Sequence, residues 1–120
     1  MVKVVITEFK VEKLNLGQKS IDVSFAYDQD GSRNKFTKKL MIGENVVNFV
    51  LAAISDIKKV TGMPLVQIEK EEDTREKMVN TINRLFVEIK DLQKIKESEK
   101  YMKQYSRINS YKVSLLEFNK

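Results

Sequence analysis

The chain has 120 residues, of which 42% are apolar and 32% charged, and its formal net charge is +5. This length favours a single domain over residues 1–120, with enough chain to bury a core of its own. The sequence contains no cysteine and no histidine. That excludes disulfides, thiolate catalysis, sulfur-ligated zinc sites and nucleophilic arrangements built on histidine. We therefore expect no cofactor and no metal, and we favour a non-catalytic role.

The apolar segments are short. Glu8 interrupts the apolar run near the N-terminus, and no stretch approaches the ~20 apolar residues of a membrane span. We therefore expect no signal peptide, no contact with a membrane and a cytoplasmic location.

Three N-terminal segments, residues 2–14, 19–28 and 34–42, alternate between apolar and polar side chains. A period of two is typical of half-buried strands, so we predict an antiparallel meander. Between the second and third segments, Asp30-Gly31 favours a two-residue type I′ turn, which requires positive φ at both positions. Centring the hairpin there predicts these opposite pairs: Phe25 with Phe36, Ile21 with Leu40, Asp28 with Arg33, and Asp22 with Lys39.

The first turn of the meander is predicted over residues 15–17, with Gly17 in the left-handed conformation. This loop places Phe9 opposite Val23. Lys38 then falls on the apolar face of the sheet. We interpret it as an inward charge on an edge strand, which discourages pairing with other chains.

A helix is predicted from Asn45 or Glu44 to Gly62 and Pro64, because apolar residues recur between them at helical spacing. Its apolar stripe is broad, so we expect it to lie across the apolar face of the meander. Residues 65–68 are compatible with a strand or with an extended linker, and this alternative stays open.

The next helical pattern runs from about Thr74 to Arg107 without glycine or proline. Asp73 with Glu76 resembles a capping box at its start. The apolar stripe changes direction near residues 96–100, which leaves two interpretations open. Either the helix breaks and its second half folds back, or one long helix contacts two surfaces and serves in dimerisation.

The end of the chain predicts one more strand, because Tyr111, Val113 and Leu115 alternate with other residues. This strand either joins an edge of the meander or pairs with another chain. The predicted fold is therefore α+β: an N-terminal three-stranded antiparallel meander, a helix, a long helix that is continuous or broken, and a C-terminal strand. Sheet and helices form two layers.

Two surfaces are candidates for binding, and they imply different functions. The divided apolar stripe of the long helical segment favours self-association or a protein partner, through Leu85, Ile89, Leu92, Ile95, Tyr101 and Tyr105. The polar face of the sheet offers cations to the phosphates of a nucleic acid, namely Lys10, Arg33, Lys35 and Lys39. We favour a small interaction or assembly module that forms a homo-oligomer through the long helix or the terminal strand. Nucleic-acid binding is the alternative.

Overall fold

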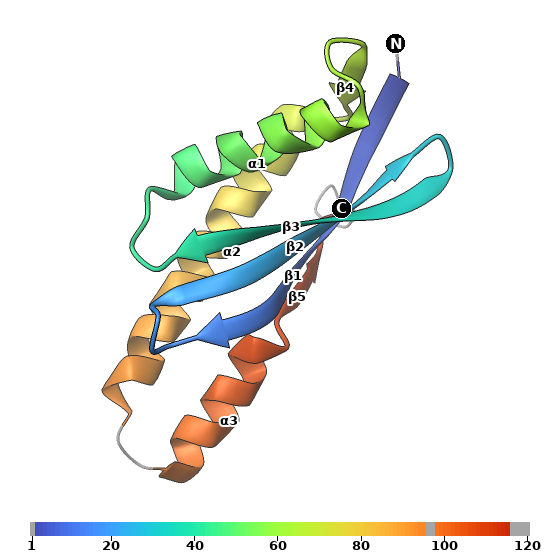
Figure 1. The fold of residues 1–120 in the computed structure, drawn as a ribbon. Coiled ribbons are helices and arrows are strands. Elements are labelled where there is room, and N and C mark those ends of the chain that lie inside the picture. The colour runs from blue at the N-terminus through green and yellow to red at the C-terminus, as the bar shows by residue number, and fades with distance from the viewer. Residues whose placement is uncertain (1, 96–97, 116–120) are drawn as a thin grey trace.

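The protein is an α+β fold, as the sequence predicts. The computed structural model describes residues 2–95 and 98–115. In chain order the elements are β1 (Val2–Asn15), β2 (Ser20–Gln29), β3 (Ser32–Met41), α1 (Val46–Thr61), β4 (Val66–Ile68), α2 (Glu71–Lys94), α3 (Ser98–Asn109) and β5 (Lys112–Ser114). Three antiparallel strands are thus followed by helices, and the C-terminal strand returns to the sheet (Figure 1).

The strands form one sheet in the order β3-β2-β1-β4, and β5 also pairs with β1. β4 runs parallel to the start of β1, with Val66 beside Val2. β5 runs antiparallel to the middle of β1, with Val113 beside Phe9. Since β2 occupies the other side of β1, β4 and β5 lie along the same side. Residues 66–68 are therefore a strand, and the terminal strand joins the sheet of its own chain.

The hairpin of β2 and β3 has the predicted register, including the pairs Phe25 with Phe36 and Asp22 with Lys39. The φ angles of Asp30 and Gly31 are 51° and 79°. Both are positive, as a type I′ turn requires.

The register of β1 with β2 differs from the prediction, because Phe9 pairs with Phe25 and not with Val23. The cause is the connecting turn, which is longer than predicted. Its left-handed residue is Lys19, with φ of 52°, and not Gly17.

A pair of irregularities in β1 partly offsets this difference. The register shifts between Ile6 and Glu8 and again between Val11 and Lys13. An extra residue at a bulge reverses the side on which the following side chains lie. The buried apolar residues of β1 therefore follow a broken alternation: Val4, Ile6, Phe9, Val11 and Leu14.

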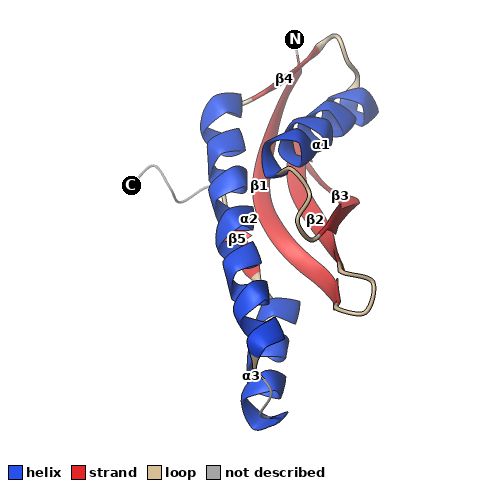
Figure 2. Ribbon diagram, turned by 90° about the vertical axis from the view of Figure 1, so that its left-hand side faces the viewer, coloured by secondary structure: helices blue, strands red, loops and turns tan. Residues whose placement is uncertain are grey.

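Helix α1 has the predicted ends. The side chain of Asn45 accepts a hydrogen bond from the Asn48 N–H at 2.9 Å, and Gly62 closes the helix with φ of 118°. α1 and α2 lie on the same face of the sheet (Figure 2). The ring of Phe49 in α1 lies 6.4 Å from the ring of Phe25 in β2, so this face of the sheet and the helices share one core.

The long helical segment is two helices. α2 ends at Lys94, α3 begins at Ser98, and α3 runs back toward the sheet beside the end of α2 (Figure 1). An ion pair between Glu88 and Arg107 joins the two helices. The predicted capping box is wrong, because α2 already begins at Glu71 and no side chain caps it. Asp73 lies instead in the first turn, where the helix dipole favours an acid.

Candidate functional site

One edge of the sheet, the outer side of β1, is covered by other parts of the chain. Val2 donates to the Leu65 carbonyl at 2.9 Å, and Val11 donates to the Tyr111 carbonyl at 2.8 Å. Between these two points, Thr7 accepts from Leu115 at 2.8 Å. Backbone groups of β4 and β5, and of the residues next to them, thus bond the outward N–H and C=O groups of β1 over most of its length.

Side chains of α3 complete the cover at the end of β1. The Leu14 N–H donates to Asn109 Oδ1 at 2.7 Å, and the Leu14 carbonyl accepts from the Tyr105 hydroxyl at 3.0 Å. A strand edge with bonded N–H and C=O groups cannot accept a further strand. The β1 side of the sheet is therefore covered at its start, its middle and its end.

The opposite edge, the outer side of β3, is open. No strand of the described residues pairs with β3 except β2. In a two-residue hairpin, the residues that flank the turn bond each other, and bonded and non-bonded pairs then alternate. Gln29 and Ser32 flank this turn. The N–H and C=O groups that point away from β2 therefore belong to the odd-numbered residues of β3, Arg33, Lys35, Thr37 and Lys39.

The end of β3 agrees with this assignment. Met41 is the next odd-numbered residue, and its N–H donates outward to Glu44 Oε1 at 3.0 Å. The side chains of Phe36 and Leu40 pack toward the core. Since side chains alternate along a strand, those of Arg33, Lys35 and Lys39 lie on the other face of the sheet, away from α1 and α2. We call this the open face. Outward backbone groups and exposed cations thus belong to the same residues.

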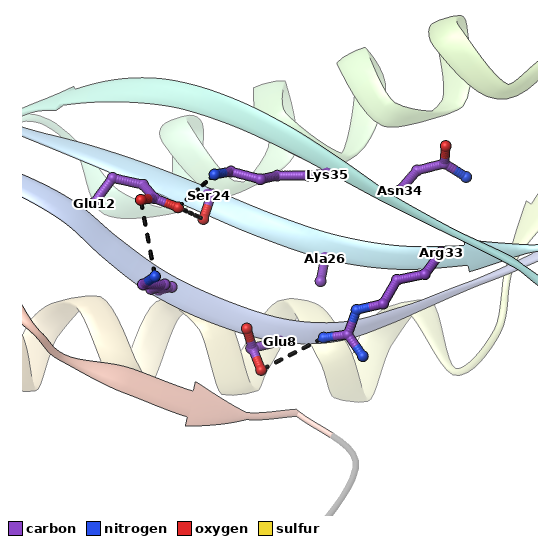
Figure 3. Close-up of a pocket in the computed structure, with 8 residues that line it drawn as sticks. Glu8, Glu12, Ser24, Ala26, Arg33, Asn34 and Lys35 are labelled. Atoms are coloured by element: carbon purple, nitrogen blue, oxygen red, sulfur yellow. Dashed lines mark hydrogen bonds and ion pairs between the residues drawn. The ribbon is translucent and has the colours of Figure 1, made fainter.

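The open face carries a cavity of about 340 Å³ across β1, β2 and β3 (Figure 3). Its lining residues are Glu8, Lys10, Glu12, Ser24, Ala26, Arg33, Asn34 and Lys35. Two carboxylates of β1 lie among the cations. Glu8 is 3.6 Å from Arg33 and 3.2 Å from Lys112, and Glu12 is 2.7 Å from Lys35. The face is therefore a mixed-charge surface with an excess of cations.

Contacts with Lys35 and Ser24 favour the ionised form of Glu12. Lys35 donates to its carboxylate, and Ser24 Oγ donates to Oε1 at 2.8 Å. Lys10 adds a weaker attraction at 4.0 Å. These contacts, with the Lys35 hydrogen bond the largest, lower the pKa of Glu12 below its ordinary value. Glu12 thus anchors Lys35 at ordinary pH.

The residues predicted to contact nucleic acid gather on this face. Lys10, Arg33 and Lys35 line the cavity, with side chains 45%, 62% and 59% exposed. Lys39 lies farther along β3 on the same side. The carboxylates Glu8 and Glu12 were missing from the predicted set, although their alternation with Phe9 and Val11 in the sequence indicates the same face.

The residues predicted to contact a protein partner fall into a buried group and a half-buried group. Leu85, Ile89 and Leu92 have no exposed surface, because they belong to the core of this chain. Ile95, Tyr101 and Tyr105 are half-buried. The rings of Tyr101 and Tyr105 stack on each other at 5.9 Å, and the Tyr105 hydroxyl is the one that bonds Leu14.

Lys38 takes the inward position on β3 that the sequence predicts. It lies opposite Val23, on the helix-facing side of the sheet. Asp56 of α1 pairs with it at 3.2 Å, and its ammonium group lies 5.9 Å from the centre of the Phe49 ring. An inward charge of this kind hinders apolar sheet-to-sheet association at an edge.

Within residues 2–95 and 98–115, no group of acidic side chains is arranged to hold a metal ion. None of the helices so described is long and apolar enough to cross a membrane.

The comparisons with known proteins do not place the chain in a family. A scan against protein-family models, a search of curated proteins and a search of solved structures each returned no match. The functional proposal therefore rests on the geometry of the sheet.

Proposed function

We propose that this chain is a non-catalytic protein-interaction module, and that it binds an extended segment of a partner along the open edge of β3. The observation that carries this proposal is the difference between the two edges of the sheet. The β1 side is closed by β4, β5 and α3, whereas β3 has outward N–H and C=O groups at alternate residues. An added strand satisfies such groups through main-chain hydrogen bonds.

The proposed binding site on β3 differs from the surfaces that the sequence predicts for a protein partner. β5 already bonds β1 of its own chain, so it is not available to pair with another chain. Leu85, Ile89 and Leu92 are enclosed in the core. Self-association through these groups would require the fold to open, whereas binding along β3 requires no rearrangement.

The test is a substitution that removes one outward N–H. Thr37→Pro deletes a donor that points away from β2, so the hydrogen bonds between β2 and β3 remain. Thr37→Val changes the side chain and keeps the N–H, and serves as the matched control. Peptides selected from a random library against the wild-type chain should bind Thr37→Val and fail to bind Thr37→Pro. Selected peptides that bind both variants equally, or a selection that yields none, would contradict the proposal.

Nucleic-acid binding is the second candidate, and one observation favours it. Lys10, Arg33 and Lys35 lie around one cavity on an open face. Against it, Glu8 and Glu12 lie in the same cavity and pair with these cations. Phosphate contacts weaken steeply as salt rises. Light scattering behind size exclusion, with a mixed oligonucleotide pool at low and high salt, decides this candidate: a complex that forms only at low salt supports it, and no complex at low salt removes it.

A further inference from the structure

We infer that the segment which binds β3 is acidic, with carboxylates at alternate positions along an extended strand. This inference rests on the proposed function, because it names the partner of the same edge. It follows from the charges of β3 and from the side of the sheet on which they lie. It also follows from the like charges that would oppose each other if a second copy of β3 paired with the first.

The charge of β3 has one sign. The strand from Ser32 to Met41 contains Arg33, Lys35, Lys38 and Lys39, and no acidic residue. The outward backbone groups belong to the odd-numbered residues, as derived above. A strand that bonds to them places its own side chains directly beside Arg33, Lys35, Thr37 and Lys39, about 5 Å away. The charges of these neighbours therefore decide which strand fits.

A second copy of β3 fits poorly. In a two-fold antiparallel pair, odd-numbered residues must lie opposite odd-numbered residues for both backbones to bond. In the registers where the two copies overlap by at least five residues of β3, Arg33 faces Lys35 or Lys39, Lys35 faces itself or Lys39, or Lys39 faces itself. In the one remaining register, where Thr37 faces Lys39, Lys38 faces its own copy on the other side. Every such register puts one cation opposite another, and opposed like charges destabilise a sheet.

An acidic strand has the reverse effect. Carboxylates at every second position lie on the open face, where three of them lie beside Arg33, Lys35 and Lys39 and the one between lies beside Thr37. Lys39 forms no ion pair with any residue that the structure describes, and Arg33 contacts Glu8 only at 3.6 Å. Both can therefore accept a new carboxylate without losing a short contact. The intervening residues of the partner lie on the helix-facing side beside Phe36, which is half-buried, so apolar or β-branched residues suit those positions.

The experiment compares peptides as long as β3 that differ only in charge. Glutamate alternates with valine or threonine in the first peptide, and glutamine or lysine replaces glutamate in the others. Fluorescence anisotropy with the full chain measures their affinities. Each cross-strand ion pair contributes a few tenths to ~1 kcal/mol. We therefore expect the glutamine peptide to bind roughly tenfold more weakly than the glutamate peptide, and the lysine peptide more weakly still.

Hydrogen exchange measured by NMR identifies the mode of binding. Strand addition should slow the exchange of the amides of Arg33, Lys35, Thr37 and Lys39. The amides of Phe36 and Lys38 already bond β2, so their exchange should change little. This alternation is a signature that contact between charged side chains alone would not produce.

Charge reversal provides a variant that keeps every N–H and C=O group of β3, although it places glutamate opposite Asp28 and Asp22 of β2. Arg33→Glu with Lys39→Glu removes the two cations that lack short partners and keeps the contact between Lys35 and Glu12. This double variant should bind the glutamate peptide about tenfold or more weakly than the wild type does, and it should bind the lysine peptide more tightly. The matched control is Lys59→Glu with Lys90→Glu, which changes the net charge equally at exposed positions on α1 and α2. It should leave both affinities nearly unchanged.

The outcomes separate this inference from the proposed function. If the glutamine peptide binds as tightly as the glutamate peptide, with alternating protection, the inference is overturned and binding at β3 stands. The same holds if the chain dimerises through β3 as its concentration rises. If no peptide of any charge produces alternating protection, both are overturned. Tighter binding of a mixed oligonucleotide pool, without alternating protection, overturns both in favour of nucleic acid.

Discussion

Replacement of Asn109 by alanine should destabilise the protein, because this side chain closes the end of β1. The Leu14 N–H donates to Asn109 Oδ1 at 2.7 Å, and Leu14 is only 1% exposed. A buried donor that loses its partner costs about 1–3 kcal/mol. Alanine at the last residue of α3 recovers up to ~0.7 kcal/mol through its higher helix propensity. The net loss in the free energy of unfolding should be about 0.5–2 kcal/mol.

Two further variants control this prediction. Asn109→Asp keeps an oxygen acceptor for Leu14, and it adds a negative charge at a helix C-terminus, which costs about 0.3–1 kcal/mol. Any loss of stability in Asn109→Asp should come from that charge, so the Leu14 amide should stay protected from hydrogen exchange. Ser106→Ala changes an exposed position of the same helix and should stay within ~0.5 kcal/mol of the wild type.

Urea unfolding followed by circular dichroism measures the free energies, and hydrogen exchange of the Leu14 amide measures the local effect. Faster exchange at Leu14 should accompany the loss of stability in Asn109→Ala alone. The reasoning is refuted if Asn109→Ala is as stable as Ser106→Ala and its Leu14 amide exchanges no faster than in the wild type.

Three other predictions concern single residues. Asp56→Ala leaves the half-buried Lys38 without its carboxylate, so urea unfolding should show a loss of about 0.5–1 kcal/mol. Gly31→Ala should cost about 1 kcal/mol by the same assay, because φ at this position is 79°. The folded protein lowers the pKa of Glu12 from its ordinary 4.5, so the stabilisation that Glu12 provides is complete above that pH and disappears as the pH falls through the lowered value. The stability of Glu12→Gln, measured from pH 7 to pH 3, should therefore fall less steeply than that of the wild type; equal slopes would contradict this.

The parts of the fold that the sequence predicts well are determined by neighbouring residues. The hairpin of β2 and β3 follows from Asp30-Gly31 and from the alternation on either side, because turn and pattern agree on one register. The ends of α1 follow from Asn45 and Gly62 in the same way. In each case the determining residues lie within or directly beside the element.

The parts that the sequence predicts poorly depend on contacts between distant residues or on irregular backbone. The bulges of β1 shift its register, and their only trace in the sequence is the uneven spacing of Val4, Ile6, Phe9, Val11 and Leu14. The change of direction near residues 96–100 correctly indicates a boundary between two helical surfaces. It cannot show that α3 folds back, because that choice depends on contacts such as the one between Tyr105 and Leu14.

The sequence predicts the cations of the candidate site and, through Lys38, an edge position for their strand, but not which edge of the sheet stays open. Alternation places Arg33, Lys35 and Lys39 on one face of a strand, but which edge of the sheet stays open depends on where β4 and β5 pair. Both strands are short, and their partners in β1 are distant in the sequence. The order of the strands therefore had to come from the structure.

The cations of β3 admit a second explanation, in which they only prevent aggregation at an exposed edge. The structure separates the two roles by position. Lys38 points toward the helices and pairs with Asp56, so it is an inward charge of the kind that hinders association. Arg33 and Lys39 lie on the open face beside outward backbone groups, where they lack short partners among the described residues. Repulsion between copies depends only on like charge, so reversing the sign of Arg33 and Lys39 preserves it in every register described above except those that place Arg33 or Lys39 opposite Lys35. Recognition of an acidic strand depends on the sign of the charge itself. The charge-reversed variant therefore distinguishes an edge that only resists aggregation from an edge that binds an acidic strand.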